Sequence, residues 1–416
     1  MRVFKFGGAS VKDAASIKNV KTVLETTGFE NLVVVVSAMG KMTNALEAVV
    51  AHYLKKSPEL QASLGEVYDY HNNILEDLFP EKSHQVYKDV KTLFEELKQF
   101  LESNKSTNHA YVYDQVVCYG ELISTKIITH FLNKNNIPNT WLDSRECIKT
   151  DSNYRDAGVD WELTQNRIKE KVSPGELTVT QGFLGSNENN FTTTLGREGS
   201  DYTAAIFAYC LGGESVTIWK DVPGVLNADP RVFKETRLLQ QISYREAIEM
   251  AFYGASVIHP KTLQPLQRKE IPLYVKSFLN PLQEGTSVAK GKDLEPAVSC
   301  YIVKKEQVLI SLSSLDFSFM MEDHIGDVFK LLHEYKMKVN LIQNSAISFS
   351  VCVDNKFNKL DELLTKLKPK FKLRYNENVT LYTIRHFNDK EVDRLEKQFE
   401  VFVKQQSRET VQLVVR

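Results

Sequence analysis

The chain has 416 residues, which is too long for one ordinary hydrophobic core, so we expect two or three domains. Its 52 Lys and Arg residues nearly balance its 53 Asp and Glu residues, which leaves a formal charge of −1. This balance predicts no nucleic acid partner and no acidic interaction tail. The sequence also lacks an apolar run of about 18 residues, so we expect no membrane partner.

The cysteines are five in number and lie far apart, at Cys118, Cys147, Cys210, Cys300 and Cys352. No two of them have the spacing of a zinc motif or a redox pair. The first residues, MRVFKFGGAS, lack the apolar segment of a secretion signal. We therefore expect reduced thiols and a cytoplasmic location.

Over about the first 280 residues, short aliphatic runs alternate with helical patterns, which predicts an α/β domain with a largely parallel sheet. The expected strands are residues 3–6, residues 32–36, Val179 with its neighbours, residues 216–219 and residues 273–275. Between the second and third of these strands lies a mostly helical stretch, residues 43–134. Its charged residues recur on one side of the helical period, which predicts a solvated helical insert.

Residues 280–296 are polar and interrupted by glycine and proline, which predicts a linker. Beyond the linker we expect a ferredoxin-like β-α-β-β-α-β order: residues 308–312, 325–335, 339–342, 347–353, 360–367 and 380–384. A shorter copy of the pattern follows, with a helix at 389–398 and strands at 400–404 and 410–415. This copy stops before a second helix and a final strand could complete it.

Lys5 ends the first expected strand and is followed by Gly7, Gly8 and Ser10. Glycines at such a turn let backbone amides approach an anion closely, and a lysine adds a point charge. The same residues could equally form an ordinary tight turn, so this motif by itself is a weak sign of phosphate binding.

The segment from Thr192 to Asp201 runs from a polar loop into an expected helix. Its plainest interpretation is that Ser200 caps the helix and Asp201 favours the positive helix end. That interpretation does not require the glycines or Arg197, and together these residues suit an anionic ligand. Arg197 could bind a carboxylate through two parallel hydrogen bonds.

Several other positions have simple structural alternatives. The segment 219–231 ends a strand and opens a loop, where ligands gather in parallel sheets, but proline and glycine also make ordinary turns. Glu121 could be a solvated helical residue, Thr43 a helix cap and His259 a structural histidine. The nine histidines show no metal-ligand spacing, so we expect no metal held by protein side chains alone.

Taken together and in this order, seven segments resemble the aspartate kinases of the amino acid kinase family: residues 5–11, 36–44, 119–125, 180–183, 192–205, 219–231 and 253–260. The resemblance covers residues 1–288 and implies a three-layer α/β/α sandwich with the helical insert at 43–134. The tail resembles the paired ACT regulatory domains of these enzymes. It implies one ferredoxin-like ACT domain at 300–384 and a shortened second one at 380–416.

The resemblance implies a phosphotransferase that moves the γ-phosphoryl of ATP to the side-chain carboxylate of L-aspartate and forms ADP and 4-phospho-L-aspartate. This is the first step towards lysine, threonine and methionine. It further implies that Mg²⁺ arrives on the nucleotide and that ACT domains join a homodimer. The chemistry agrees, because an aspartate side chain has a pKa of about 3.9 and is already ionised at neutral pH. Such a nucleophile needs alignment and positive charge, and no general base.

Residue roles follow from the same resemblance. Lys5 should contact the transferring phosphoryl group, and Asp201 should hold Lys5 in place. L-aspartate should be bound by Ser37, Thr43, Glu121, Arg197 and Ser200, with Glu121 on the ammonium and Arg197 on the α-carboxylate. ATP should lie among Lys5, Gly7, Gly8, Ser10, Lys220, Asp221, Arg231 and Ser256.

The chain departs from many of these relatives at four positions: Glu198 replaces glycine, Lys220 replaces threonine, Leu226 replaces tyrosine and Ser256 replaces lysine. We hypothesise that Lys220 supplies the positive charge missing at position 256. In the tail, Asn340 and Ala346 stand where lysine-inhibited relatives carry acids. A cationic effector would miss those charges, so we expect weak feedback by lysine or none.

Two alternatives remain open at this point. Another member of the family would phosphorylate glutamate, acetylglutamate or UMP, and substrate screening would separate these activities. A sensor of amino acids that has lost catalysis is suggested by Leu226 and Ser256, and binding without turnover would support it. Retention of Lys5, Arg197 and Asp201 favours an active enzyme.

Overall fold

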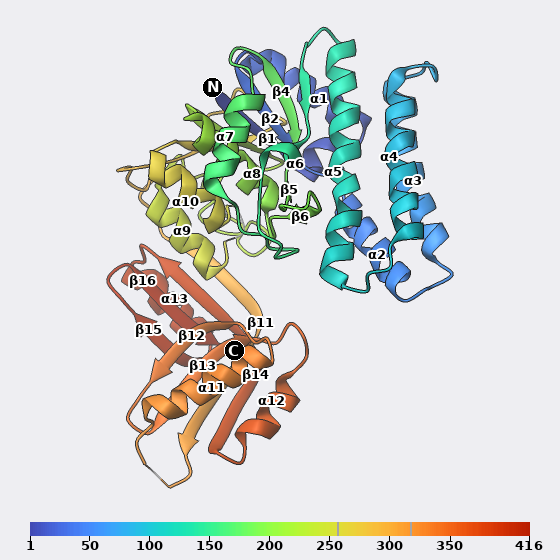
Figure 1. Ribbon diagram of the computed structural model, residues 1–416. Coiled ribbons are helices and arrows are strands. Elements are labelled where there is room, and N and C mark those ends of the chain that lie inside the picture. Colours follow the sequence, from blue (N-terminus) through green and yellow to red (C-terminus); the bar gives the residue numbers. More distant parts are fainter. Residues whose placement is uncertain (256–257, 317) are drawn as a thin grey trace. The chain divides into compact units, whose positions relative to one another are not determined.

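The structure is a computed structural model that describes residues 1–255, 258–316 and 318–416 (Figure 1). Its chain forms two compact units. The first contains Met1–Val225, Leu238–Ile248 and residues 258–294, and the second contains Leu226–Arg237, residues 249–255 and Glu295–Arg416. Two short segments from the first two thirds of the sequence therefore pack with the C-terminal part.

The first large sheet has eight strands in the order β3-β4-β2-β1-β7-β9-β10-β8, and every neighbouring pair except β9 and β10 is parallel. The elements are β1 (Arg2–Phe6), η1 (Gly8–Val11), α1 (Ala14–Thr27), β2 (Leu32–Val36), α2 (Met42–Leu54), α3 (Leu60–Leu78), α4 (Gln85–Ser103), α5 (His109–Lys134), β3 (Thr140–Leu142), α6 (Ser144–Cys147), α7 (Trp161–Lys171), β4 (Leu177–Gln181), β5 (Leu184–Ser186), β6 (Thr192–Thr194), α8 (Gly199–Leu211), β7 (Ser215–Lys220), β8 (Gln241–Ser243), α9 (Tyr244–Tyr253), α10 (Pro260–Lys269), β9 (Leu273–Ser277) and β10 (Thr286–Ala289). The prediction of a largely parallel sheet is confirmed.

Alternation of side chains along β1 separates the two faces of this sheet. Phe4 and Phe6 belong to one hydrophobic core with α1 to α5. Lys5 points to the opposite face, where α8 packs against β1, β2 and β7. Helices therefore cover both faces, and the predicted three-layer α/β/α sandwich is confirmed (Figure 1).

The predicted helical stretch at 43–134 is helical, as α2 to α5, but it is not a solvated insert throughout. The 26 residues of α5 are buried along most of their length, and Val116, Ile123 and Ile127 lie in the core. Half of the charged residues in this stretch lie on α3 and α4. The apolar character of α5 is instead that of a core helix, which packs on β2 and β4.

The predicted linker at 280–296 contains the strand β10, so that prediction is wrong for residues 286–289. Gly285 precedes the strand with a φ of +71°, and a Cβ on it would lie 2.2 Å from the backbone oxygen of Val275. The glycine that suggested a linker thus marks a close approach of two strands.

The second unit contains one antiparallel sheet of six strands in the order β12-β13-β11-β14-β16-β15. Its elements are β11 (Cys300–Ser314), α11 (Glu322–Glu334), β12 (Val339–Asn344), β13 (Ser348–Asp354), α12 (Leu360–Leu367), β14 (Phe371–Arg385), α13 (Asp389–Gln398), β15 (Val401–Gln406) and β16 (Thr410–Val415). The first ferredoxin-like pattern is present as β11, α11, β12, β13, α12 and β14.

The shorter second pattern shares strands with the first. The end of β14 continues through α13, β15 and β16, and residues 300–304 of β11 pair with residues 381–385 of β14. The first part of β11 therefore serves as the fourth strand of the second pattern. The sequence could not show this, because the completing strand comes earlier in the chain.

All five cysteines are buried and form no disulfide. Among the described residues, no helix combines the length and the apolar character needed to cross a membrane.

Candidate active site

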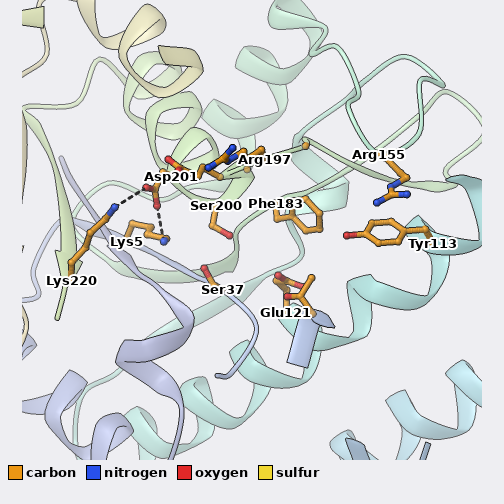
Figure 2. Close-up of a pocket in the computed structure, with 14 residues that line it drawn as sticks. Lys5, Ser37, Tyr113, Glu121, Arg155, Phe183, Arg197, Ser200, Asp201 and Lys220 are labelled. Carbon is orange, nitrogen blue, oxygen red and sulfur yellow. Dashed lines mark ion pairs between the residues drawn. The ribbon is translucent and has the colours of Figure 1, made fainter. Parts of the chain in front are cut away.

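A cavity of about 540 Å³ lies in the first unit at the carboxyl ends of four neighbouring parallel strands. Lys220 ends β7, Lys5 lies near the end of β1, Ser37 follows β2 and Phe183 comes shortly after β4. Figure 2 shows these four residues in the same order across the cavity. Ligands gather at this edge in open parallel sheets, because the strand ends leave a crevice there.

Asp201 lies between two lysines at one end of the cavity (Figure 2). The Nζ atom of Lys5 is 2.6 Å from its Oδ1 atom, and the Nζ atom of Lys220 is 3.9 Å from its Oδ2 atom. Burial favours a raised pKa for Asp201, but the charges of Lys5 and Lys220 outweigh it and hold the pKa below its usual value. Two ammonium groups around one carboxylate leave a net positive charge, which suits an anionic ligand.

The glycine turn after β1 packs tightly against the turn after β2. A Cβ on Gly8 would lie 2.7 Å from the backbone oxygen of Gly40, and one on Gly7 would lie 3.2 Å from Nζ of Lys5. The Ser10 hydroxyl donates to the backbone oxygen of Trp219 over 3.3 Å. Gly7 thus borders Lys5, but none of Gly7, Gly8 and Ser10 lines the cavity, and their contact with a nucleotide stays a prediction.

Glu121 reaches the cavity from α5 and is almost completely buried. Burial is the largest influence and raises its pKa to about 8, although the backbone amide of Ala38 opposes the shift. Its Oε2 atom has no hydrogen-bond partner among the described residues. Because a buried polar atom is costly without a partner, this oxygen is a place where a ligand could donate hydrogen bonds.

Arg197 and Ser200 line the same cavity around the start of α8. Arg197 forms no ion pair with any residue that the structure describes, so its donors remain open to an anion. Gly182 allows the helix start to approach β4, since a Cβ on it would lie 2.4 Å from the Cβ of Ser200. The expectation that Ser200 caps α8 is wrong: the cap position is Glu198, which makes no side-chain capping bond.

Thr43 also lines the cavity, as the second residue of α2. The cap position of that helix is Lys41, so the alternative of Thr43 as a cap is wrong. The side chain of His259 accepts a hydrogen bond from the amide of Lys261 and caps α10, which confirms its structural role.

Three residues of the cavity wall adopt the left-handed backbone conformation: Arg155 and Phe183 with a φ of +72°, and Glu198 with a φ of +54°. Each costs about 1 kcal/mol relative to a glycine-like backbone, and such strain clusters at functional sites. The positive φ at position 198 fits the glycine that many relatives carry there, and the structure gives no reason for the glutamate.

The structure brings together eight of the predicted site residues: Lys5, Ser37, Thr43, Glu121, Arg197, Ser200, Asp201 and Lys220. It does not bring Asp221 or Arg231 into the cavity wall. Asp221 is exposed after β7, whereas Arg231 belongs to the second unit and pairs with Asp229. Ser256 lies outside the described residues.

Sequence reasoning missed Tyr113 and Arg155 in the cavity wall. Tyr113 lies two turns before Glu121 on α5, so the helical period could have placed it near the site. Arg155 lies in a loop without periodicity, where no sequence signal marks it.

Comparisons with known proteins agree with this geometry. Residues 1–277 match the Amino acid kinase family. Lysine-sensitive aspartokinase 3 of Escherichia coli is 32% identical over 357 residues, covering 85% of this chain and 78% of that protein. Two crystal structures of E. coli aspartokinase III match 100% of this chain and 96% of theirs. The complex with lysine and aspartate (T-state) has a TM-score of 0.85 at 29% identity, and the complex with aspartate and ADP (R-state) has 0.82 at 28%. The chain belongs to the amino acid kinase family.

Proposed function

We propose that this protein is an aspartate kinase, which transfers the γ-phosphoryl of ATP to the side-chain carboxylate of L-aspartate. One observation carries the proposal: a single cavity holds Lys5 and Lys220 around Asp201 together with a carboxyl oxygen of Glu121 that has no hydrogen-bond partner among the described residues. The lysines suit a phosphoryl group and a nucleophilic carboxylate, and Glu121 suits an ammonium. The similarity to E. coli aspartokinase III in complex with aspartate and ADP supports the same pair of ligands.

In this proposal some residues supply positive charge and others orient the substrate. Lys5, held by Asp201, offsets the repulsion between the substrate carboxylate and the phosphates. Ser37 and Ser200 lie between the lysines and Glu121, where their hydroxyls can orient the nucleophile (Figure 2). Arg197 adds a further cation at the start of α8. Because the substrate carboxylate is already ionised, no residue has to remove a proton from it.

Mg²⁺ belongs to the same proposal as a companion of the nucleotide. Among the described residues, no group of three or more His, Cys, Asp or Glu side chains is placed to hold a metal ion. Mg²⁺ is often bound by substrate phosphates, waters and one or two carboxylates, so this residue set fits a metal that arrives on ATP. Bound there, the ion would neutralise charge on the transferring phosphoryl group.

The reaction is tested by measuring ADP release with Mg-ATP and L-aspartate while hydroxylamine traps the acyl phosphate. We expect aspartate-dependent hydroxamate. Glutamate, acetylglutamate and UMP serve as competing substrates, and turnover with one of them alone would point to a different member of the family. Binding of aspartate without any turnover would point to a sensor.

Lys220→Ala should lower kcat/KM for ATP by about tenfold, as expected for a phosphate-side cation that is partly exposed to solvent. The physical reason is the lost ammonium beside Asp201, at the position that we hypothesise compensates for Ser256. Steady-state kinetics at varied ATP measure the effect. Lys171→Ala, which breaks an exposed pair with Glu146, is the matched control. Unchanged turnover and KM for ATP would refute the compensation.

L-lysine at about 10 mM should inhibit the enzyme less than twofold, because a cation gains little at a site without acids. Asn340 is neutral, and its Oδ1 atom already accepts a hydrogen bond from Nζ of Lys304 over 2.7 Å. Ala346 is exposed and carries no charge. The hydroxamate assay with added lysine measures the response, with sodium chloride as the ionic-strength control. Strong inhibition at submillimolar lysine would contradict this prediction.

A homodimer joined through the ferredoxin-like units and a cytoplasmic location complete the proposal. Light scattering in solution would test the first part, and a mass of one chain at micromolar concentration would argue against it.

A further inference from the structure

Building on the proposed function, we propose that Arg155 binds the α-carboxylate of L-aspartate and thereby helps to select this substrate. Arg155 lines the same cavity as Lys5 and Glu121, although it comes from a loop far from both in the sequence.

The charged groups of the cavity follow one another in the order of the charged groups of the substrate. Figure 2 shows Lys220 and Lys5 at one end, Glu121 further along, and Tyr113 with Arg155 at the other end. L-aspartate carries a side-chain carboxylate, an ammonium and an α-carboxylate. If the side-chain carboxylate faces Lys5 and the ammonium faces Glu121, the α-carboxylate lies at the end of the molecule away from the nucleophile. Arg155 is the cation at that end.

The loop that carries Arg155 is anchored by a buried carboxylate. Asp114 is fully buried, and its Oδ2 atom accepts a hydrogen bond from the backbone N–H of Arg155 over 3.1 Å. The same carboxylate accepts the amide and the hydroxyl of Thr194, over 2.9 and 2.7 Å. One side chain thus fixes Arg155 relative to the segment that leads to Arg197. The left-handed backbone of Arg155 is held at this anchor.

The guanidinium of Arg155 has two contacts that position it, and it keeps N–H donors for a ligand. Its Cζ atom is 4.2 Å from the centre of the Tyr113 ring, which supports it from one side. Its Nη2 atom is 3.4 Å from Oε1 of Glu47, in a pair whose two side chains are both nearly half exposed. An exposed pair of this kind is weak, and a guanidinium has five N–H donors. A carboxylate entering the cavity can therefore bind Arg155 without breaking a strong contact.

Arg155→Asn is the variant to make. Asparagine tolerates the left-handed conformation, and its backbone N–H can still donate a hydrogen bond to Asp114. Two substrates are compared, L-aspartate and its α-amide, isoasparagine, which keeps the side-chain carboxylate and the ammonium but lacks the α-charge. We expect the variant to raise KM for L-aspartate about tenfold and to leave kcat and KM for ATP within twofold. For isoasparagine, kcat/KM should change less than twofold.

Arg155→Lys, which keeps the charge but loses the planar fork, should fall between the wild type and Arg155→Asn. Arg167→Asn removes an exposed arginine that pairs with Glu170 and is the matched control, and thermal melting checks the fold of each variant. Equal losses for both substrates, or no loss for L-aspartate, would overturn the inference. If the wild type shows no turnover, the proposed function fails. Calorimetric binding of the same two compounds to wild type and Arg155→Asn then decides the inference by the same comparison.

Discussion

Lys5→Ala should lower kcat by about 10³-fold or more, which is the size of effect seen when a charge-stabilising group is removed from a transition state. Nζ of Lys5 is 2.6 Å from Asp201, and the side chain is buried at the carboxyl end of β1. A carboxylate must approach a polyanionic nucleotide, and Lys5 is the buried cation at the place where they meet. The hydroxamate assay measures the loss.

The loss must be separated from a damaged fold. Removal of Lys5 takes away the 2.6 Å partner of the buried Asp201 and leaves Lys220 at 3.9 Å, and removing one partner of a buried ion pair costs about 3–5 kcal/mol of stability. The double variant Lys5→Gln/Asp201→Asn leaves two neutral groups that can still share a hydrogen bond. It should recover much of the melting temperature and none of the activity. A folded Lys5→Ala enzyme that retains a tenth of the wild-type turnover would show that Lys5 is not the central cation.

The sequence predicted buried strands well and short strands poorly. The strand 32–36 was predicted to the residue, because a parallel strand covered on both faces reads as a continuous aliphatic run. The three-residue strands β6 and β8 have no such pattern, since their pairing partners rather than their own residues define them. The strand β10 was also missed, because it is short and the glycines on either side of it were interpreted as part of a linker.

The site divides in a similar way. Lys5, Ser37 and Lys220 were predictable, because they stand at or after strands whose carboxyl ends meet at one edge. Arg155 was not, because its position depends on the buried hydrogen bonds of Asp114. The same partners oppose the effect of burial on that carboxyl, whose pKa is nevertheless raised to about 6. Nothing in a sequence separates such an aspartate from a solvated one.

Glu121 gives the site a dependence on pH that the sequence did not suggest. Burial raises its pKa to about 8, so only about a tenth of the empty sites carry the ionised form at pH 7. Between its ordinary value of 4.5 and about 8, the folded protein keeps a proton that the unfolded chain has released. Stability of the empty protein should therefore fall as pH rises through this window. An ammonium ligand has the opposite preference, since it binds the ionised form.

The affinity for L-aspartate should consequently rise about tenfold between pH 7 and pH 9, and binding at pH 7 should release close to one proton per site. Calorimetry in two buffers with different ionisation enthalpies measures the released proton, and KM for aspartate across the pH range measures the affinity. Glu121→Gln should raise KM about a hundredfold, through the lost charge pair, and should abolish both the pH dependence and the proton release. Glu146→Gln, at an exposed glutamate outside the cavity, should change neither. If the wild type releases no proton and its KM for aspartate is constant from pH 7 to pH 9, then Glu121 does not lose a proton when the substrate ammonium binds.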